Sequence, residues 1–114
     1  MPKTRDGLQA LPGIGQYVAS AVLVYVYGRP APLLDTNMAR VLERFFGDRQ
    51  LADIRYDPYL QELAQAVVDG NDAKSVNWAV LDLAATVCRL RAPRCIECPL
   101  ATRCLFAKEA RSAA

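Results

Sequence analysis

Four cysteines near the C-terminal end constrain this chain more than any other feature. Cys88, Cys95, Cys98 and Cys104 follow the spacing C-x6-C-x2-C-x5-C within seventeen residues. Thiols packed this closely in a chain with no sign of secretion favour a metal site over disulfides. The spacing leaves two cofactors open, because four thiolates can hold either a [4Fe–4S] cluster or a tetrahedral zinc ion.

The N-terminus supports a reducing environment for these thiols. Residues 1–6 contain no apolar signal core, and no stretch of the sequence reaches eighteen consecutive apolar residues. We therefore expect a cytoplasmic protein without a membrane partner. A length of 114 residues, of which 53% are hydrophobic, is enough for one packed core.

Charge is distributed unevenly along the chain, whose net charge is only +2. Residues 1–87 contain eight basic and ten acidic side chains, whereas residues 88–114 contain six basic and two acidic ones. A basic cysteine segment can face a polyanion, although a solvated tail has the same composition. The sequence contains no histidine, so any general base is expected to be a carboxylate.

The rest of the chain has the pattern of an all-α fold. Helical segments are predicted at residues 5–11 and 16–27, from Asp35 or Thr36 to Gly47, from Asp57-Pro58 to Gly70, and from Asn71 or Asp72 to Val87. Apolar residues at helical spacing and glycine stops support the last three segments. Residues 22–27 have the composition of a buried strand, and their assignment as helix depends on the resemblance described below.

Two polar features lie between these helices. The turn Leu11-Pro12-Gly13-Ile14-Gly15 allows close approach of a ligand to the backbone, and its amides can bind a phosphate, with Leu11 and Ile14 as apolar anchors. Without other signals, it is an ordinary corner between helices. Asp35 is a helix cap by position, and a helix N-terminus also favours an ionised carboxylate.

Together these features resemble the helix-hairpin-helix DNA glycosylases of the endonuclease III superfamily. The resembling segments are Leu11–Ala19 for the hairpin, Leu33–Leu42 for the catalytic aspartate, and Asp82–Cys104, with Cys98-Pro99-Leu100, for the iron–sulfur loop. Their order and intervals match over residues 7–106. The resemblance implies the C-terminal half of such an enzyme, with residues 1–34 in an incomplete hairpin lobe and residues 35–114 in a cluster lobe.

The resemblance also implies roles for individual residues. Asp35 takes the place of the catalytic aspartate, which stabilises an oxocarbenium-like transition state, orients water or attacks the sugar. The cysteines take the place of [4Fe–4S] ligands, with zinc as the alternative. The residues expected to bind DNA are Gly13, Ile14, Gly15 and Gln16 of the hairpin, and Arg89, Arg91 and Arg94 of the cysteine loop.

Tyr17 stands where bifunctional members of the superfamily have a Schiff-base lysine, so no lysine-dependent lyase activity is expected. Tyr17 with Asp35-Thr36-Asn37 resembles the monofunctional MutY-like and Mig-type branch, and we expect Tyr17 to lie in the catalytic site. The implied substrate is double-stranded DNA with adenine opposite G or 8-oxoguanine, or thymine or uracil opposite G.

One departure from the family pattern concerns the missing first half, which normally supplies the base pocket and the strand wedge. We expect the 114 residues alone to have little activity and to expose apolar surface, with the other half supplied in trans or replaced by self-association. Two alternatives remain open from the sequence: a DNA-binding module without catalysis, and a zinc-binding interaction module.

Overall fold

A computed structural model describes residues 2–70 and 72–113, and every regular element within these ranges is a helix. The elements are α1 (Arg5–Gln9), α2 (Gln16–Tyr25), α3 (Thr36–Phe46), α4 (Pro58–Val68), α5 (Ala73–Thr86), a 3-10 turn η1 (Cys95–Glu97) and α6 (Leu105–Ala113). The expected all-α fold is confirmed. None of the described helices has the length and apolar character needed to cross a membrane.

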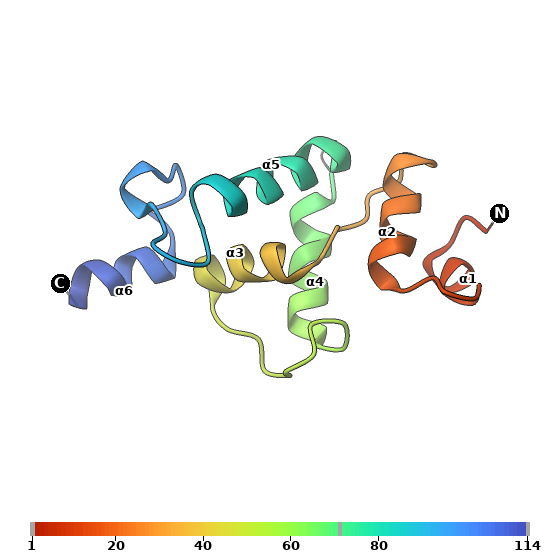
Figure 1. Ribbon diagram of the computed structural model, residues 1–114, viewed down its shortest axis with the longest axis horizontal. Helices are drawn as coiled ribbons and strands as arrows, with labels where there is room; N and C mark the ends of the chain where they lie inside the picture. Colours follow the sequence, from red (N-terminus) through yellow and green to blue (C-terminus); the bar gives the residue numbers. More distant parts are fainter. Residues whose placement is uncertain (1, 71, 114) are drawn as a thin grey trace.

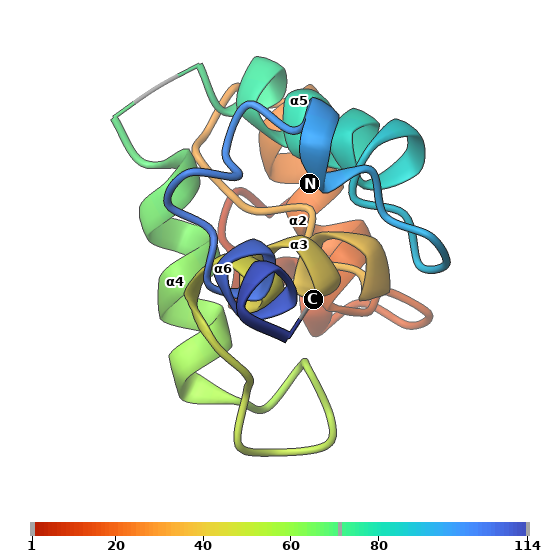
Figure 2. The same ribbon diagram turned by 90° about the vertical axis from the view of Figure 1, so that its left-hand side faces the viewer.

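The molecule is elongated, with principal extents of 52 × 28 × 23 Å, and α3 lies at its centre (Figure 1). Helix α3 packs against α4, α5 and α6. Helix α1 packs on α2 at the end of the long axis that lies away from α6. Viewed along the long axis, α4 and α5 lie on different sides of α3, and α6 lies in front of it (Figure 2). The α3 helix therefore connects the hairpin end of the molecule with the cysteine loop.

Three helices begin at aspartate caps, as the sequence predicts. The carboxylates of Asp35, Asp57 and Asp72 accept hydrogen bonds from the backbone N–H three residues later, at 2.9, 2.8 and 3.4 Å. Each cap satisfies a backbone donor at the helix start and contributes about 1 kcal/mol. Asn71, the alternative cap for α5, lies outside the described residues.

Helix α2 shows why residues 22–27 do not form a strand. Its buried positions are Ala19, Ser20, Leu23 and Val24, which lie on one face only if the segment is helical. These side chains pack with Leu8 and Ala31 in a cluster at the hairpin end. The helix ends at Tyr25, two residues earlier than predicted. A second apolar cluster joins α3 and α4 and includes Leu34, Met38 and Leu60.

The C-terminal end contains a helix beyond the last predicted helical segment, which ended at Val87. Helix α6 follows Cys104 and packs on α3. Ala107 is buried, and the guanidinium of Arg44 lies 4.8 Å from the centre of the Phe106 ring. The segment is short, and its packing on α3 depends on residues far away in the sequence, so that packing could not be predicted locally.

Candidate active site and cysteine pocket

The turn between α1 and α2 exposes its backbone at two glycines. Gly13 has a φ of +79°, a conformation that favours glycine, and Gly15 caps α2 with extended backbone. A Cβ atom at either position would meet nothing within 4 Å, so the peptide groups border open space. Ile14 packs on the hairpin cluster as predicted, but Leu11 is 39% exposed and does not anchor the turn in the core.

Gln16 connects this turn to α4. Its side-chain amide donates to the carbonyl of Arg55 at 3.3 Å and accepts from Nε2 of Gln61 at 3.0 Å. The Gln61 amide also donates to the carbonyl of Ile54 at 2.8 Å. The start of α2 is therefore held against the loop that precedes α4, across about forty residues of sequence.

Asp35 has a fixed carboxylate at the start of α3. Its Oδ1 accepts from the backbone N–H of Met38 at 2.9 Å, and its Oδ2 accepts from Nδ2 of Asn37 at 3.3 Å. The residue is partly exposed, while Leu33 and Leu34 before it are buried. The cap thus holds the carboxylate at the surface in one orientation.

Tyr17, in the first turn of α2, lies within electrostatic range of this carboxylate. Partial burial, and then the negative charge of Asp35 and the neighbouring Tyr25, raise the pKa of the Tyr17 hydroxyl above its ordinary value of 10.0. Tyr17 therefore stays protonated at neutral pH. The two side chains that the sequence assigned to catalysis are thus within electrostatic range of each other, although they are eighteen residues apart in the sequence.

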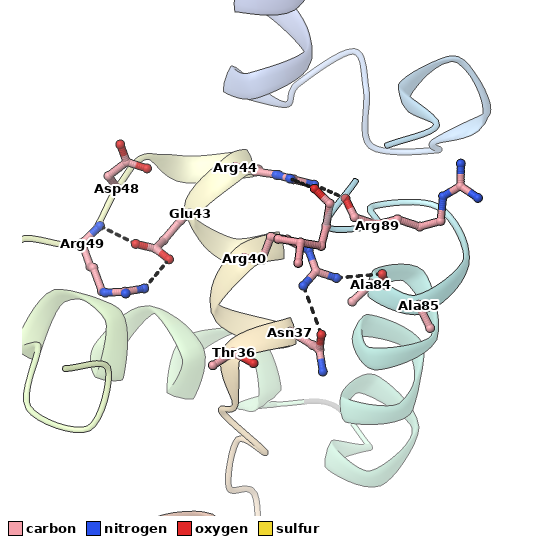
Figure 3. A pocket seen from close by; sticks show the side chains of 11 residues that line it. Thr36, Asn37, Arg40, Glu43, Arg44, Asp48, Arg49, Ala84, Ala85 and Arg89 are labelled. Atoms are coloured by element: carbon pink, nitrogen blue, oxygen red, sulfur yellow. Dashed lines mark hydrogen bonds and ion pairs between the residues drawn. The ribbon is translucent and has the colours of Figure 1, made fainter. Parts of the chain in front are cut away.

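Arg40 links the surroundings of Asp35 to the cysteine loop. Its guanidinium donates to Oδ1 of Asn37 at 3.0 Å and to the carbonyl of Ala84 at 2.8 Å (Figure 3). It also donates to the carbonyl of Cys88 at 3.0 Å. Because Asn37 also binds Asp35, a continuous chain of hydrogen bonds runs from the carboxylate to the first cysteine. Arg40 also satisfies carbonyls at and just after the C-terminal end of α5.

Arg44 repeats this connection one turn further along α3. It donates to the carbonyls of Arg89 at 2.7 Å and Leu90 at 3.2 Å, and it lies 3.5 Å from Sγ of Cys88. In the opposite direction, Sγ of Cys104 lies 3.3 Å from the carbonyl of Arg44. Both ends of the cysteine segment are therefore held by the same turn of α3.

The four cysteines converge on one pocket. All of them line it, together with Arg44 and Phe106, and each is a partly buried free thiol. Burial, and then the proximity of the other three thiols, raise the pKa of Cys95, while Arg44 lowers it. Among the described residues, however, no three cysteine, aspartate or glutamate side chains form a group that could hold a metal ion as they stand.

The three arginines of the cysteine loop have different surroundings. Arg91 is exposed, and Arg94 is exposed but pairs with Glu97 at 3.4 Å. Arg89 is only partly exposed, and it donates to the carbonyl of Ala92 in its own loop at 2.8 Å. Ala92 has a φ of +50°, which marks a tight turn at the tip of the loop. Arg91 is thus the most available of the three for an external anion.

A wide pocket beside α3 extends from Thr36 and Asn37 to Arg89 and Leu90 (Figure 3). Its lining includes several arginines, but internal acceptors already occupy them. Arg40 and Arg44 bind the carbonyls described above, and Arg49 pairs with Glu43 at 2.8 Å. The positive charge of this pocket therefore stabilises the loop and carries no indication of a ligand.

Sequence reasoning overlooked Asn37, Arg40 and Arg44 as site residues. They lie at positions i, i+3 and i+7 of α3, a spacing that places polar side chains on one face. That pattern was detectable as a polar stripe, but it did not identify partners more than forty residues away. These arginines bind backbone carbonyls that follow the end of α5, where no further helical hydrogen bond uses the carbonyl oxygen.

Comparisons with known proteins agree with this geometry. The helix-hairpin-helix motif matches residues 1–25. A thymine-DNA glycosylase from Aeropyrum pernix is 41% identical, with 93% of this chain and 49% of the relative covered. A thymine/uracil-DNA glycosylase from Pyrobaculum aerophilum is 44% identical, with 93% and 48% covered. The human adenine DNA glycosylase is 37% identical, with 91% and 19% covered.

Solved structures show the same fold. A thermostable thymine-DNA glycosylase superposes with a TM-score of 0.86 at 30% identity, over 96% of this chain and 50% of the other. Endonuclease III in a non-covalent complex with DNA superposes with a TM-score of 0.77 at 24% identity, over 98% and 51%. The chain spans about half the length of the thymine and thymine/uracil relatives that it matches.

The fold and the similarities indicate the class: over nearly its whole length the chain is similar to helix-hairpin-helix DNA glycosylases of the endonuclease III superfamily. The resemblance inferred from the three sequence segments is confirmed. Within that superfamily, its relatives named thymine, thymine/uracil and adenine DNA glycosylase place it in the MutY-like and Mig-type branch.

Proposed function

We propose that this chain is the catalytic part of a base-excision repair DNA glycosylase, which hydrolyses the N-glycosidic bond of a mispaired base. The Asp35 carboxylate, which the Met38 amide holds in place and whose charge acts on Tyr17 two residues after the glycine turn, carries this proposal. Its relatives are named as glycosylases for thymine, uracil or adenine. The proposed substrate is therefore thymine or uracil opposite G, or adenine opposite G or 8-oxoguanine, in double-stranded DNA.

The proposed role of Asp35 follows from its hydrogen bonds. A carboxylate held by the Met38 amide and by Asn37 does not rotate freely, so its charge is already oriented when positive charge develops on the sugar. Water then adds to the anomeric carbon and gives up one proton, while the base departs with the bonding electron pair and takes up one proton, so that the bond is hydrolysed. A carboxylate can assist by electrostatic stabilisation, by orienting the water or by direct attack.

Tyr17 supports hydrolysis without lysine-dependent strand cleavage. A protonated phenol cannot form a Schiff base with the sugar, and Tyr17 occupies the position beside Asp35 where such chemistry would need an amine. Its hydroxyl is available to donate a hydrogen bond. We therefore propose a monofunctional enzyme in which Tyr17 helps position the nucleotide next to Asp35.

DNA is the proposed partner of the glycine turn. The backbone around Gly13, Ile14, Gly15 and the start of α2 borders open space, which suits a phosphate at the N-terminus of a ten-residue helix. Gln16, at the start of α2, holds this turn in place through its hydrogen bond to the loop before α4. Exposed Arg91, with Arg89 and Arg94 nearby in sequence, supplies positive charge at the cysteine loop.

A [4Fe–4S] cluster is the proposed cofactor of the cysteine pocket. The four thiols line one pocket, and four thiolates are the ligand set of such a cluster, with zinc as the alternative. Arg44 beside Cys88 offsets part of the thiolate charge. When bound, the cluster would tie the loop to the C-terminal end of α5 and to α6.

The exposed apolar face of α2 is evidence for binding of a partner polypeptide. Val18, Tyr25 and Val26 are 44%, 46% and 59% exposed, and Trp78 beside them on α5 is 53% exposed. A helix that is apolar on nearly every side usually lies inside a larger protein. We propose that a complementing half, or a second copy, covers this face and completes the base pocket.

The test measures base release on T:G, U:G and A:8-oxoguanine duplexes by strand cleavage after alkali. The chain is assayed with and without a complementing N-terminal half, and its iron and zinc contents are measured in parallel. We expect release from at least one duplex with the half present, and iron without zinc. Salt-sensitive DNA binding with no release on any duplex would instead indicate a non-catalytic DNA-binding module.

A further inference from the structure

The second part of the connection between α2 and α3, residues 31–34, is buried but has no regular secondary structure. Residues 28–34 are irregular, while Ala31, Leu33 and Leu34 are only 1%, 1% and 5% exposed. Backbone N–H and C=O groups in such a segment are removed from water and need partners within the protein. Those partners determine where the segment lies, and with it the aspartate that follows.

Asn77, on α5, is one of these partners. Its side chain is 0% exposed, and its Oδ1 accepts from the backbone N–H of Leu33 at 2.7 Å. Its Nδ2 donates to the carbonyl of Ala31 at 2.9 Å and to the carbonyl of Ala73 at 2.8 Å. One amide therefore binds the segment on both sides of residue 32 and fixes it to α5, as a neighbouring strand would do.

A second side chain holds the beginning of the same segment. Nε2 of Gln65, on α4, donates to the carbonyl of Pro30 at 3.0 Å. The connection is thus attached to both α4 and α5 before the chain reaches Asp35, which lies two residues after Leu33. Since Tyr17 precedes this connection and Asp35 follows it, any shift of residues 31–33 changes the separation of the two side chains.

We propose that Asn77 is a positioning residue, which acts by fixing the backbone of residues 31–33 and thereby the placement of Asp35 relative to Tyr17. This inference rests on the proposed glycosylase function, in which Asp35 acts at the sugar. It assigns Asn77 no contact with DNA. Displacing a catalytic group by about 1 Å can lower a rate by about a hundredfold, so a buried amide outside the site can control turnover.

The structure provides a matched control in Asp57. This side chain is 1% exposed and, like Asn77, makes three hydrogen bonds to backbone groups, all of which it accepts, from Gln50, Leu51 and Leu60 at 2.8–2.9 Å. Asp57→Ala and Asn77→Ala each leave backbone groups without partners in a buried place, so both lower the stability. Only Asn77 binds the segment that leads to Asp35.

The first measurement needs no catalysis. Hydrogen exchange of the Met38 amide reports the bond from that amide to Asp35, and it is followed in the full-length protein under conditions where each variant is folded. After correction for global stability, we expect Asn77→Ala to accelerate this exchange by about tenfold and Asp57→Ala to leave it unchanged. Equal acceleration in both variants, or none in Asn77→Ala, would overturn the proposal.

The second measurement is single-turnover base release alongside affinity for product DNA. We expect Asn77→Ala to lower the rate by about ten- to a hundredfold with little change in affinity, and Asp57→Ala to lower it by no more than about twofold. If Asn77→Ala does not fold, Gln65→Leu tests the same segment and should show a smaller effect in the same direction. Wild-type protein without base release refutes the proposed function, while the exchange measurement still decides the role of Asn77.

Discussion

Arg40 donates a hydrogen bond to the carbonyl of Cys88 at 3.0 Å, and this bond joins the helix that begins at Asp35 to the first cysteine of the loop. The same guanidinium binds Asn37, whose amide in turn binds the Asp35 carboxylate. The position of the proposed catalytic carboxylate and the geometry of the cysteine pocket are therefore linked by these hydrogen bonds. We expect a change in either one to alter the other.

The first prediction concerns Arg40→Met, which keeps a long side chain but removes all three hydrogen bonds. Carbonyls of Ala84 and Cys88 at the end of α5 lose a charged donor, and we expect a loss of stability of about 1–3 kcal/mol. Iron retention should fall as well, because the loop is no longer held. Thermal unfolding and iron content measure these effects.

Arg91→Met is the matched control for this substitution. Arg91 is exposed on the same loop, and it should affect neither the melting temperature nor the iron content. Its affinity for duplex DNA should fall instead, with a weaker dependence on salt. Identical behaviour of the two variants would show that Arg40 contributes only charge.

The parts of the fold that could be predicted are those encoded locally. Each of α3, α4 and α5 starts at an aspartate whose side chain accepts a hydrogen bond from the backbone N–H three residues later. Apolar spacing within α3 identified its buried face, which includes Met38 and Leu42. Helix α6 was missed because it depends on packing against α3, and α2 was ambiguous because valine and tyrosine suit strands as well.

The site was predictable in its residues but not in its connections. The family resemblance selected Asp35, Tyr17 and the cysteines, and the structure brings the first two near each other and the four thiols to one pocket. Arg44 and Asn77 could not be found in this way, because their partners are separated from them by more than forty residues. The positions of these backbone partners depend on where a distant segment of the chain lies in the fold.

The second prediction is that Asp35→Asn abolishes base release and preserves the fold. Asparagine caps helices about as well as aspartate, so the bond to the Met38 amide survives and the stability changes by less than about 1 kcal/mol. The negative charge that stabilises the developing cation is lost. Single-turnover assays and duplex binding separate these effects, and persistent turnover would reject the assignment of Asp35.

The third prediction concerns the pH dependence of Tyr17. Because burial and Asp35 raise the pKa of its hydroxyl above 10.0, the folded protein holds this proton more tightly than the unfolded chain does. The contribution of Tyr17 to stability is therefore fully present below pH 10 and is lost as the pH rises through the folded-state pKa. Asp35→Asn should move the tyrosinate titration back toward its ordinary midpoint, which ultraviolet absorbance with a Tyr17→Phe reference would measure.

The fourth prediction compares two glycines of the same turn. Gly13 has a φ of +79°, where an alanine is strained by about 1–2 kcal/mol, whereas the extended backbone of Gly15 accepts alanine without strain. A new Cβ meets open space at both positions in the free protein. Gly13→Ala should therefore lower the melting temperature more than Gly15→Ala, which loses only the advantage of glycine over alanine at the N-cap of α2.

The affinity for duplex DNA separates the proposed role of this turn in DNA binding from the effect of the substitutions on stability. If phosphate approaches the bare backbone, the methyl group of Gly15→Ala occupies that space and weakens DNA binding while the fold is retained. Gly13→Ala should weaken binding too, through the altered turn. The affinity loss should be similar for matched and mismatched duplexes, because backbone contacts carry no sequence information. Unchanged affinity in Gly15→Ala would mean that DNA does not approach the turn closely, and the proposed interface would then have to lie elsewhere on the molecule.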